Sequence, residues 1–394
     1  MPVSKKIEAS IQKSSWIRKM FEEGIARKAK FGAENVYDFS LGNPNLEPPA
    51  SFRSVLRKLV EDEQPGRHAY MPNAGIVETR QAVADYLGKH NRQSFTPGDV
   101  VMTVGAGGAL NVVLKTILNP GEEIILPSPY FVEYNYYLDN HQGVPRVVPT
   151  RKDFSLDLEA IEKAVTQNTR GILINSPNNP TGKVYREEDL KALGELLSRC
   201  SSRFGQPVYL ISDEPYRKIV YDDVPVPGVF DAYRESFVVT SFSKDLSLPG
   251  ERIGYAVVHP EMADKAMIMG GMILCNRILG YVNAPAFMQR AVALMLEEAV
   301  DISLYRKKRD MLCDGLASCG FEFVKPEGAF YLFPRTPIED DVAFVGVLQE
   351  ENILAVPGSG FYGPGHIRLA YCVDDGTIER SIPAFERVMK KVKG

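Results

Sequence analysis

The sequence predicts an α/β protein in which helices cover a mostly parallel sheet, together with a smaller α+β domain. From about residue 99 the chain alternates strand-like and helix-like segments, which is typical of βαβ units. After about residue 283 this alternation stops, and a long helical stretch precedes short strands and a terminal helix. The 394 residues also exceed one ordinary core, so one large domain and one smaller domain are expected.

The change of pattern along the chain sets the expected domain boundaries. Residues 1–45 precede the sheet-forming part, so we expect them to form an N-terminal arm that packs with the small domain. Residues 46–282 are expected to form the large domain, and residues 283–394 the small C-terminal domain.

Apolar runs predict the individual elements. The strands of the large sheet are expected at 99–104, 122–127, 170–175, 208–214, 236–241 and 252–258. Helices are expected from the glycine-rich run near residue 105 to Leu118, and over 157–165. In the C-terminal part, residues 284–312 read as one long helical stretch, and short strands are expected at 321–326, 329–334 and 366–371. Parallel sheets bind ligands at the carboxyl ends of their strands, so motifs at those ends are the candidate sites.

Composition excludes several classes of partner. A net charge of −4 and 24% charged residues favour neither nucleic acid nor an anionic membrane. The longest apolar runs, such as residues 291–296, fall far short of the ~20 residues of a membrane span, and no signal-peptide run opens the chain. Five cysteines without a CxxC pair and five scattered histidines predict reduced thiols, a cytoplasmic location and no metal site.

The stretch "SFSKDLSLPGERIG" (241–254) has three interpretations: a solvated turn, a phosphate-binding loop, or a lysine that does covalent chemistry. A Schiff-base lysine, as Lys244 could be, needs a free amine near neutral pH, and desolvation and nearby positive charge favour this by lowering its pKa. Ser241, Ser243 and Arg252 could clamp a phosphate beside it, with the arginine supplying a planar fork.

Three further motifs follow predicted strands. "VGAGGAL" (104–110) could place backbone amides and a helix N-terminus against a phosphate, or could simply serve packing. "INSPNNPTG" (174–182) is either an ordinary loop or a turn that aims amide side chains at one place. In "ISDEPY" (211–216), Asp213 could bind a cation, cap a helix or meet a protonated ring nitrogen, and capping is favoured in isolation. An aspartate opposite a lysine and a phosphate clamp is how proteins make pyridoxal phosphate an electron sink.

Together with "HIRLAY" (366–371), these motifs resemble the class I/II aminotransferases, the aspartate aminotransferase-like group of fold type I pyridoxal-phosphate (PLP) enzymes. The likeness covers nearly the whole chain in the family's order and approximate spacing. It implies a large PLP-binding domain with a mostly parallel, seven-stranded type of sheet between helices, and a smaller α+β domain. The implied cofactor is pyridoxal 5′-phosphate, with no metal.

The resemblance implies roles for the matching residues. Lys244 would hold the cofactor as a Schiff base and later move the α-proton. Asp213 would bind the pyridinium nitrogen, and Tyr216 and Asn179 the 3′ oxygen of the ring. The residues implied to hold the phosphate are Ala106, Gly107, Ser241, Ser243 and Arg252.

Further roles concern the substrate and a second subunit. Phe131 would stack on the cofactor, although it could also be a core phenylalanine. Arg368 would grip the substrate α-carboxylate, with Gly42 and Asn179 lining the same place. Tyr70 matches a tyrosine that reaches the neighbouring subunit's phosphate, so the resemblance implies a homodimer with shared active sites.

One position departs from the family pattern. Bacterial aspartate aminotransferases often carry a lysine in the glycine loop for the distal carboxylate of the substrate, and here that position is Gly107. A preference for dicarboxylates is therefore in doubt. Arg277 could take over that role, or could be an ordinary surface residue.

The predicted function is transfer of an amino group between an amino acid and a 2-oxo acid through PLP and pyridoxamine phosphate. A PLP-dependent lyase, such as a carbon–sulfur lyase, is the alternative on the same scaffold. A PLP-sensing regulator is disfavoured, because the roughly 40 residues before the domain are few for a DNA-binding segment.

Overall fold

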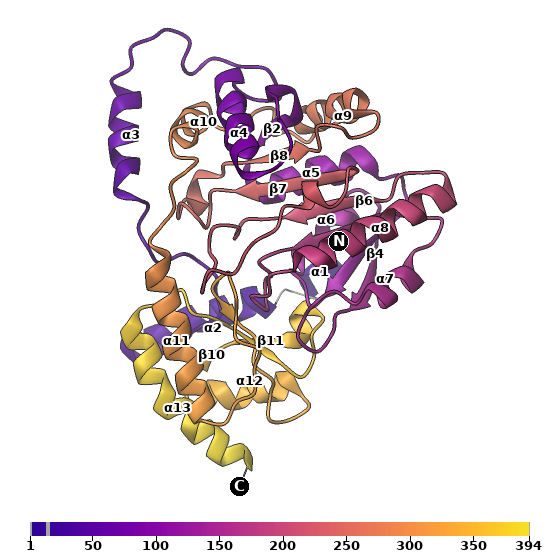
Figure 1. Cartoon of the computed structure of the whole chain (residues 1–394). Coiled ribbons are helices and arrows are strands. Elements are labelled where there is room, and N and C mark those ends of the chain that lie inside the picture. The colour runs from indigo at the N-terminus through magenta and orange to yellow at the C-terminus, as the bar shows by residue number, and fades with distance from the viewer. Residues whose placement is uncertain (1, 13–15, 394) are drawn as a thin grey trace.

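The computed structural model describes residues 2–12 and 16–393. Figure 1 shows two packed bodies: the large sheet with its helices above, and a smaller group built around α11, α12 and α13 below. The large sheet has seven strands in the order β2-β8-β7-β6-β5-β3-β4. Only β8 (Gly254–Val258) runs antiparallel to its neighbours, β2 (Val100–Thr103) and β7 (Ser236–Ser241). The predicted α/β class and the mostly parallel sheet are therefore confirmed.

The remaining strands of this sheet pair in parallel. They are β3 (Glu123–Ser128), β4 (Val144–Pro149), β5 (Thr169–Asn175) and β6 (Tyr209–Asp213). Side chains alternate between the two faces along each strand. In β5, Ile172 and Ile174 enter one hydrophobic core and Leu173 enters the other. This explains why the strands read as continuous apolar runs.

Helices supply the rest of each core. One face packs against α5 (Gly105–Ile117), α6 (Glu133–Asn140) and α9 (Lys265–Ile278). The other face packs against α4 (Val77–His90), α7 (Leu158–Ala164), α8 (Glu187–Phe204) and α10 (Ala286–Ala293), with α3 (Ala50–Val60) partly buried beside them. Helices therefore bury both faces of the sheet, as is usual for a mostly parallel sheet.

The smaller body has its own core. It contains the antiparallel sheet β11-β12-β9, made of β11 (Val356–Pro357), β12 (Ile367–Ala370) and β9 (Tyr331–Leu332). Helices α11 (Ile302–Ser318), α12 (Asp341–Glu350) and α13 (Asp375–Lys393) cover it. From the N-terminal part, α2 (Trp16–Phe31) contributes Met20, and β1 (Tyr37–Asp38) pairs in parallel with β10 (Ile353–Leu354).

Two predictions about elements were wrong, and one strand was missed. The helical stretch expected over 284–312 is two helices, because α10 ends at Ala293 and α11 begins only after Asp301, whose carboxylate caps it by accepting from the Ser303 N–H. Residues 321–326 form no strand. The edge strand β4 was missed, because two prolines and a largely exposed pattern hide it in the sequence.

The core clusters suggest where the domains divide. Ala284, Met288 and Leu296 belong to the core of the large sheet, whereas Val300 and Tyr305 belong to the core of the smaller body. We propose a boundary between Leu296 and Val300, later than the expected division at residue 283.

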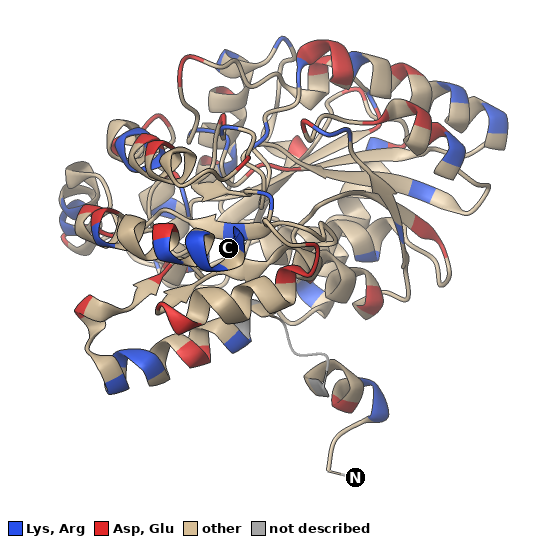
Figure 2. Ribbon diagram, turned by 90° about the horizontal axis from the view of Figure 1, so that it is seen from below, with Lys and Arg blue, Asp and Glu red and all other residues tan. Residues whose placement is uncertain are grey.

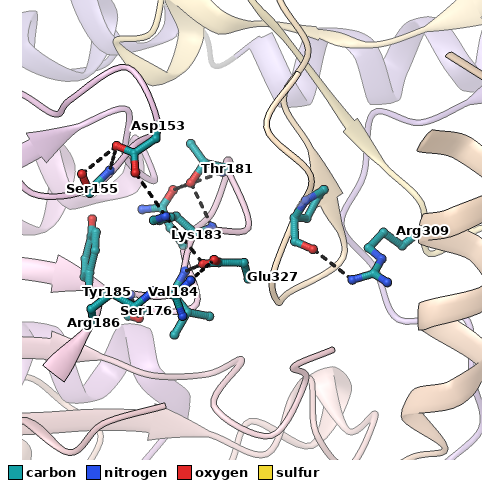
Figure 3. Close-up of polar contacts among 12 residues, drawn as sticks. Asp153, Ser155, Ser176, Thr181, Lys183, Val184, Tyr185, Arg186, Arg309 and Glu327 are labelled. Carbon is teal, nitrogen blue, oxygen red and sulfur yellow. Dashed lines mark hydrogen bonds and ion pairs between the residues drawn. The ribbon is translucent and has the colours of Figure 1, made fainter. Parts of the chain in front are cut away.

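One carboxylate joins the two bodies (Figure 3). Glu327 accepts a hydrogen bond from the Val184 N–H at 3.0 Å and from the Arg186 guanidinium, and the Lys183 ammonium lies 3.8 Å away. The backbone N–H groups of Glu327 and Gly328 both donate to the Gly182 carbonyl, at 3.0 and 2.9 Å. The segment that leads into β9 is therefore fixed to the loop that follows β5.

The surface carries both signs of charge. In Figure 2 lysine and arginine positions alternate with aspartate and glutamate along the visible helices. Over residues 2–12 and 16–393, no helix is long and apolar enough to cross a membrane. The same residues contain no group of three or more His, Cys, Asp or Glu side chains arranged to hold a metal ion.

Candidate active site

A cavity of about 1080 Å³ lies at the carboxyl ends of the parallel strands. Of the sequence-predicted site residues, all but Tyr70 and Arg277 line it. They are Gly42, Ala106, Gly107, Phe131, Asn179, Asp213, Tyr216, Ser241, Ser243, Lys244, Arg252 and Arg368. They come from segments far apart in the chain, and the strand ends of the sheet bring them together.

Lys244 lies in the loop directly after β7. Its ammonium group donates to the Gly42 carbonyl oxygen at 2.9 Å and lies 5.5 Å from the centre of the Phe330 ring. Burial, together with the positive charges of Arg368 and Arg252, lowers the pKa of Lys244 to about 8. The amine is therefore close to the neutral form that a nucleophile needs.

Asp213 ends β6 at the floor of the cavity. Its Oδ2 accepts the Tyr134 hydroxyl at 2.6 Å, while its Oδ1 is buried without a hydrogen-bond partner. Burial raises the pKa of Asp213 to about 7, although the hydrogen bond from Tyr134 opposes this. The residues after Asp213 form turns and no helix, so the capping role favoured in isolation is wrong.

The N-terminus of α5 lines the cavity. Gly105 has φ +80°, and a Cβ there would lie 3.0 Å from an Nη atom of Arg252. The glycine thus permits the guanidinium to approach the start of the helix. Ser241 and Ser243 are buried beside it. Free N–H groups at a helix N-terminus, an arginine and two hydroxyls suit a phosphate.

Arg368, on β12, lies at the other end of the cavity. Its guanidinium is held between the rings of Tyr331 and Phe361, at 4.7 and 4.6 Å from their centres. It donates to the Ser40 carbonyl at 2.6 Å and to the Asn179 side-chain oxygen at 3.2 Å, while its Nε is buried without a partner. The Arg368 guanidinium is therefore held in one orientation, and its unpartnered Nε–H can donate to a carboxylate.

Sequence reasoning missed Tyr331, which also lines the cavity. Its hydroxyl lies 2.9 Å from the hydroxyl of Tyr216, a residue 115 positions earlier in the chain. The segment "AFYLFP" was interpreted only as a strand. In the sequence, Tyr331 follows the pair Gly328-Ala329 by two residues. This position marks the junction of the two bodies only once the fold is known, so the sequence alone did not indicate a role for Tyr331.

Two residues with expected roles lie outside the cavity of their own chain. The Tyr70 side chain is 92% exposed, on a loop held by hydrogen bonds between Asn73 and the Val282 carbonyl and between Asn276 and the Asn73 carbonyl. Arg277 is exposed near the end of α9 and is not among the residues that line the cavity.

The chemistry of these groups fits pyridoxal 5′-phosphate. The unpartnered Oδ1 of Asp213 can accept from a protonated ring nitrogen, and the start of α5 with Arg252 can hold a phosphate. The Lys244 amine can react with an aldehyde. The fold and this set of groups define a PLP-dependent enzyme.

The chain belongs to the class I and II aminotransferases. The sequence model of that family, described as "Aminotransferase class I and II", matches residues 34–385. The chain is 33% identical to a probable aspartate/prephenate aminotransferase of Aquifex aeolicus over 386 residues, covering 93% of this chain and 94% of the relative. It is 30% identical to the aromatic-amino-acid aminotransferase 2 of Thermococcus litoralis, covering 96% of each chain.

Solved structures agree with this assignment. An aminotransferase of Eubacterium rectale superposes with a TM-score of 0.97 at 40% identity, covering 100% of both chains. The aspartate aminotransferase of Thermus thermophilus, solved with maleate, gives a TM-score of 0.87 at 29% identity, covering 98% of this chain and 99% of that one. The predicted PLP-dependent aminotransferase is confirmed, and none of these relatives is named a lyase or a regulator.

The pKa of Lys244 can be measured through its reaction with the cofactor. Because only the neutral amine attacks an aldehyde, attachment of PLP to the apoprotein should speed up as pH rises, with a midpoint about 8. The rate is followed by absorbance, and the attachment site by borohydride reduction and peptide mapping. Lys244→Ala is the control and should form no adduct. An adduct on another lysine, or a midpoint near the ordinary value of 10.5, would contradict the assignment.

Proposed function

We propose that the cavity residues divide the work of amino transfer as their positions suggest. Lys244 carries the cofactor and then moves the α-proton of the substrate. Asp213 holds the protonated ring nitrogen, and Tyr216 and Asn179 hold the 3′ oxygen. When bound, the cofactor supplies an electron sink for the charge left at the α-carbon.

The same proposal assigns the two ends of the cavity and its stacking face. The phosphate end consists of Ala106, Gly107, Ser241, Ser243 and Arg252. The carboxylate end consists of Arg368 and Gly42, and Phe131 packs on the cofactor ring. The observation that carries the proposal is the buried Oδ1 of Asp213, which has no partner in a cavity that also holds the Lys244 amine. A buried acceptor without a partner is costly and is rarely left so without a functional reason.

We also propose that neutral and aromatic amino acids compete well with aspartate as donors. In the described part of the chain, the cations that line the cavity are Lys244, Arg252 and Arg368, and each already has a proposed partner. No further lining cation remains for a distal carboxylate. The wall of the cavity includes Leu41, Phe21, Tyr136 and Tyr137, which suits an apolar or aromatic side chain.

The proposed assembly is a homodimer that shares its active sites. Tyr70 is almost fully exposed, lies outside its own cavity and stands on an anchored loop. An exposed aromatic residue on a rigid loop suits insertion into a second copy, and a two-fold dimer would place each Tyr70 at the partner's phosphate. The substrates are small amino and 2-oxo acids.

Replacing Asp213 tests the proposed ring-nitrogen contact. Asp213→Ala should still take up PLP but should lose most α-proton abstraction, by roughly a hundredfold, since one oriented charged group contributes ~3 kcal/mol. Single-turnover kinetics with a deuterated donor measures that step. The matched control is Asp157→Ala, which removes a carboxylate that does cap a helix and should lower stability more than rate. Near-normal proton abstraction in Asp213→Ala would refute the role.

A lysine at position 107 tests the substrate range. Gly107→Lys should raise the ratio of kcat/KM for aspartate over phenylalanine by about tenfold, because a hydrogen bond to a charged group contributes ~1.5–3 kcal/mol. A Cβ at this position would lie 3.0 Å from the Tyr137 hydroxyl, so bulk alone will have some effect. Gly107→Met is the control for bulk and should leave the ratio unchanged. Strong selectivity of the unaltered enzyme for aspartate over every neutral amino acid would contradict the proposal.

Mixed dimers test the shared site. Tyr70→Asp should place a carboxylate against the partner's phosphate, and Lys244→Ala lacks the reactive amine, so each variant alone should be nearly inactive. Unfolding both, mixing them and refolding should restore about a quarter of the unaltered activity, since half of randomly paired dimers are mixed and each has one intact site. Each variant refolded alone is the control. Properly refolded mixed dimers without activity would show that Tyr70 acts within its own chain.

A further inference from the structure

The hydroxyl groups of Tyr216 and Tyr331 form a buried pair beside the cofactor cavity. Their oxygens are 2.9 Å apart, and both residues line the cavity. The two side chains are 4% and 2% exposed. Burial raises the pKa of both phenols, that of Tyr331 to about 12. Both therefore keep their protons at neutral pH, and two O–H groups share one short contact.

Either hydroxyl could be the donor in this pair, and the proposed role of Tyr216 requires one direction. Within the described chain, the Tyr216 hydroxyl is the hydrogen-bond partner found for the Tyr331 hydroxyl. If Tyr216 donated to Tyr331, Tyr216 would have no proton left to donate to the cavity. If Tyr331 donates to Tyr216, the Tyr216 proton is free to point into the cavity. Only this second arrangement leaves the Tyr216 proton for the proposed hydrogen bond to the 3′ oxygen.

The surroundings fix Tyr331 in this position. Its hydroxyl lies where a side chain at residue 42 would begin, because a Cβ on Gly42 would be 2.0 Å from the Tyr331 oxygen. Its ring packs against the Arg368 guanidinium on one side and edge-on to the Tyr216 ring, whose centre is 5.8 Å away. The absence of a side chain at Gly42 is what admits the tyrosine.

We propose that Tyr331 is a positioning residue, whose hydroxyl donates to Tyr216 and so directs the single proton of Tyr216 to the 3′ oxygen of the cofactor. The inference rests on the proposed role of Tyr216. A phenol that accepts a hydrogen bond becomes a stronger donor through its own O–H, because hydrogen bonds in a chain polarise one another. Tyr331 thus links the residues that hold the cofactor with the arginine that holds the substrate.

The expected effect is spectroscopic. Donation from Tyr216 stabilises negative charge on the 3′ oxygen, which lowers the affinity of the adjacent Lys244–cofactor nitrogen for its proton. Tyr331→Phe removes the hydroxyl and keeps the ring against Arg368. It should therefore raise the pH midpoint of the visible absorption change of the resting holoenzyme, by about half a pH unit.

A second background separates positioning from general structural damage. Tyr216→Phe should itself raise the midpoint, and by more. Adding Tyr331→Phe to Tyr216→Phe should then produce no further shift, because the route from Tyr331 to the cofactor runs through the Tyr216 hydroxyl. Tyr305→Phe is the matched control: it is a buried tyrosine of the same core, whose ring centre lies 5.4 Å from that of Phe330, and it should leave the midpoint unchanged.

Each result of these measurements supports or overturns the positioning role of Tyr331. No shift with Tyr331→Phe, or an equal shift with and without the Tyr216 hydroxyl, would overturn the inference. If Tyr331→Phe fails to fold, Gly42→Ala provides the second route, since its methyl group would displace the Tyr331 hydroxyl and should raise the midpoint similarly. A folded Gly42→Ala without a shift would also overturn it. Failure of the unaltered enzyme to attach PLP at Lys244 would instead refute the proposed function itself.

Discussion

The carboxylate of Glu327 is the contact on which the active site depends, because it fixes the smaller body to the loop that carries Asn179. It accepts from the Val184 N–H and from Arg186, with Lys183 nearby. A carboxylate that is mostly removed from water needs such partners, and here all three lie within the chain that follows β5 (Figure 3). The interaction therefore stabilises one relative placement of the two bodies instead of either body alone.

The backbone on either side of Glu327 connects the position of the smaller body to the residues of the cavity. Gly182 has φ +71°, and a Cβ there would lie 2.5 Å from Pro326, so the two segments touch through main-chain atoms. Phe330 and Tyr331 follow within four residues of Glu327 and stand beside Lys244 and Tyr216. Because the residues proposed to hold the cofactor belong to one body and Arg368 belongs to the other, the junction sets the distance between them.

The electrostatics of the cavity show a site built to be completed by a ligand. Burial raises the pKa of Asp213 to about 7 and lowers that of Lys244 to about 8, so each group is driven toward its neutral form. Both shifts cost stability, because an ionised form that water would favour is suppressed. Protein interiors tolerate such costs mainly at functional sites. A protonated ring nitrogen beside Asp213 would return that carboxylate to its ionised form and recover part of the cost.

Local sequence patterns were sufficient to predict motifs at strand ends, but not contacts between residues that are far apart in the sequence. Strand ends with polar residues were sufficient to place Asn179, Asp213 and Lys244 at one edge of the sheet. The edge strand β4 was missed because its two prolines and exposed side chains do not resemble a buried strand. The break between α10 and α11 was missed because the capped turn lies within a stretch that otherwise has helical periodicity. Tyr331 and Glu327 gave no motif at all, because their partners are 115 and 141 to 144 residues away.

The proposed recognition of one carboxylate, and not two, rests on where the cations are held. Arg368 is immobilised between Tyr331 and Phe361 and already donates to Ser40 and Asn179, so it offers a fixed fork with one remaining direction. A planar, stacked guanidinium cannot swing to follow a second carboxylate at variable distance. In the proposed site, the side chain of the donor would extend toward Leu41, Phe21 and the tyrosines of α6, where burial of apolar surface contributes roughly 25 cal/mol per Å². An apolar wall distinguishes donors only by their size and apolar area, and such discrimination is weak. For this physical reason we expect a broad range of neutral donors.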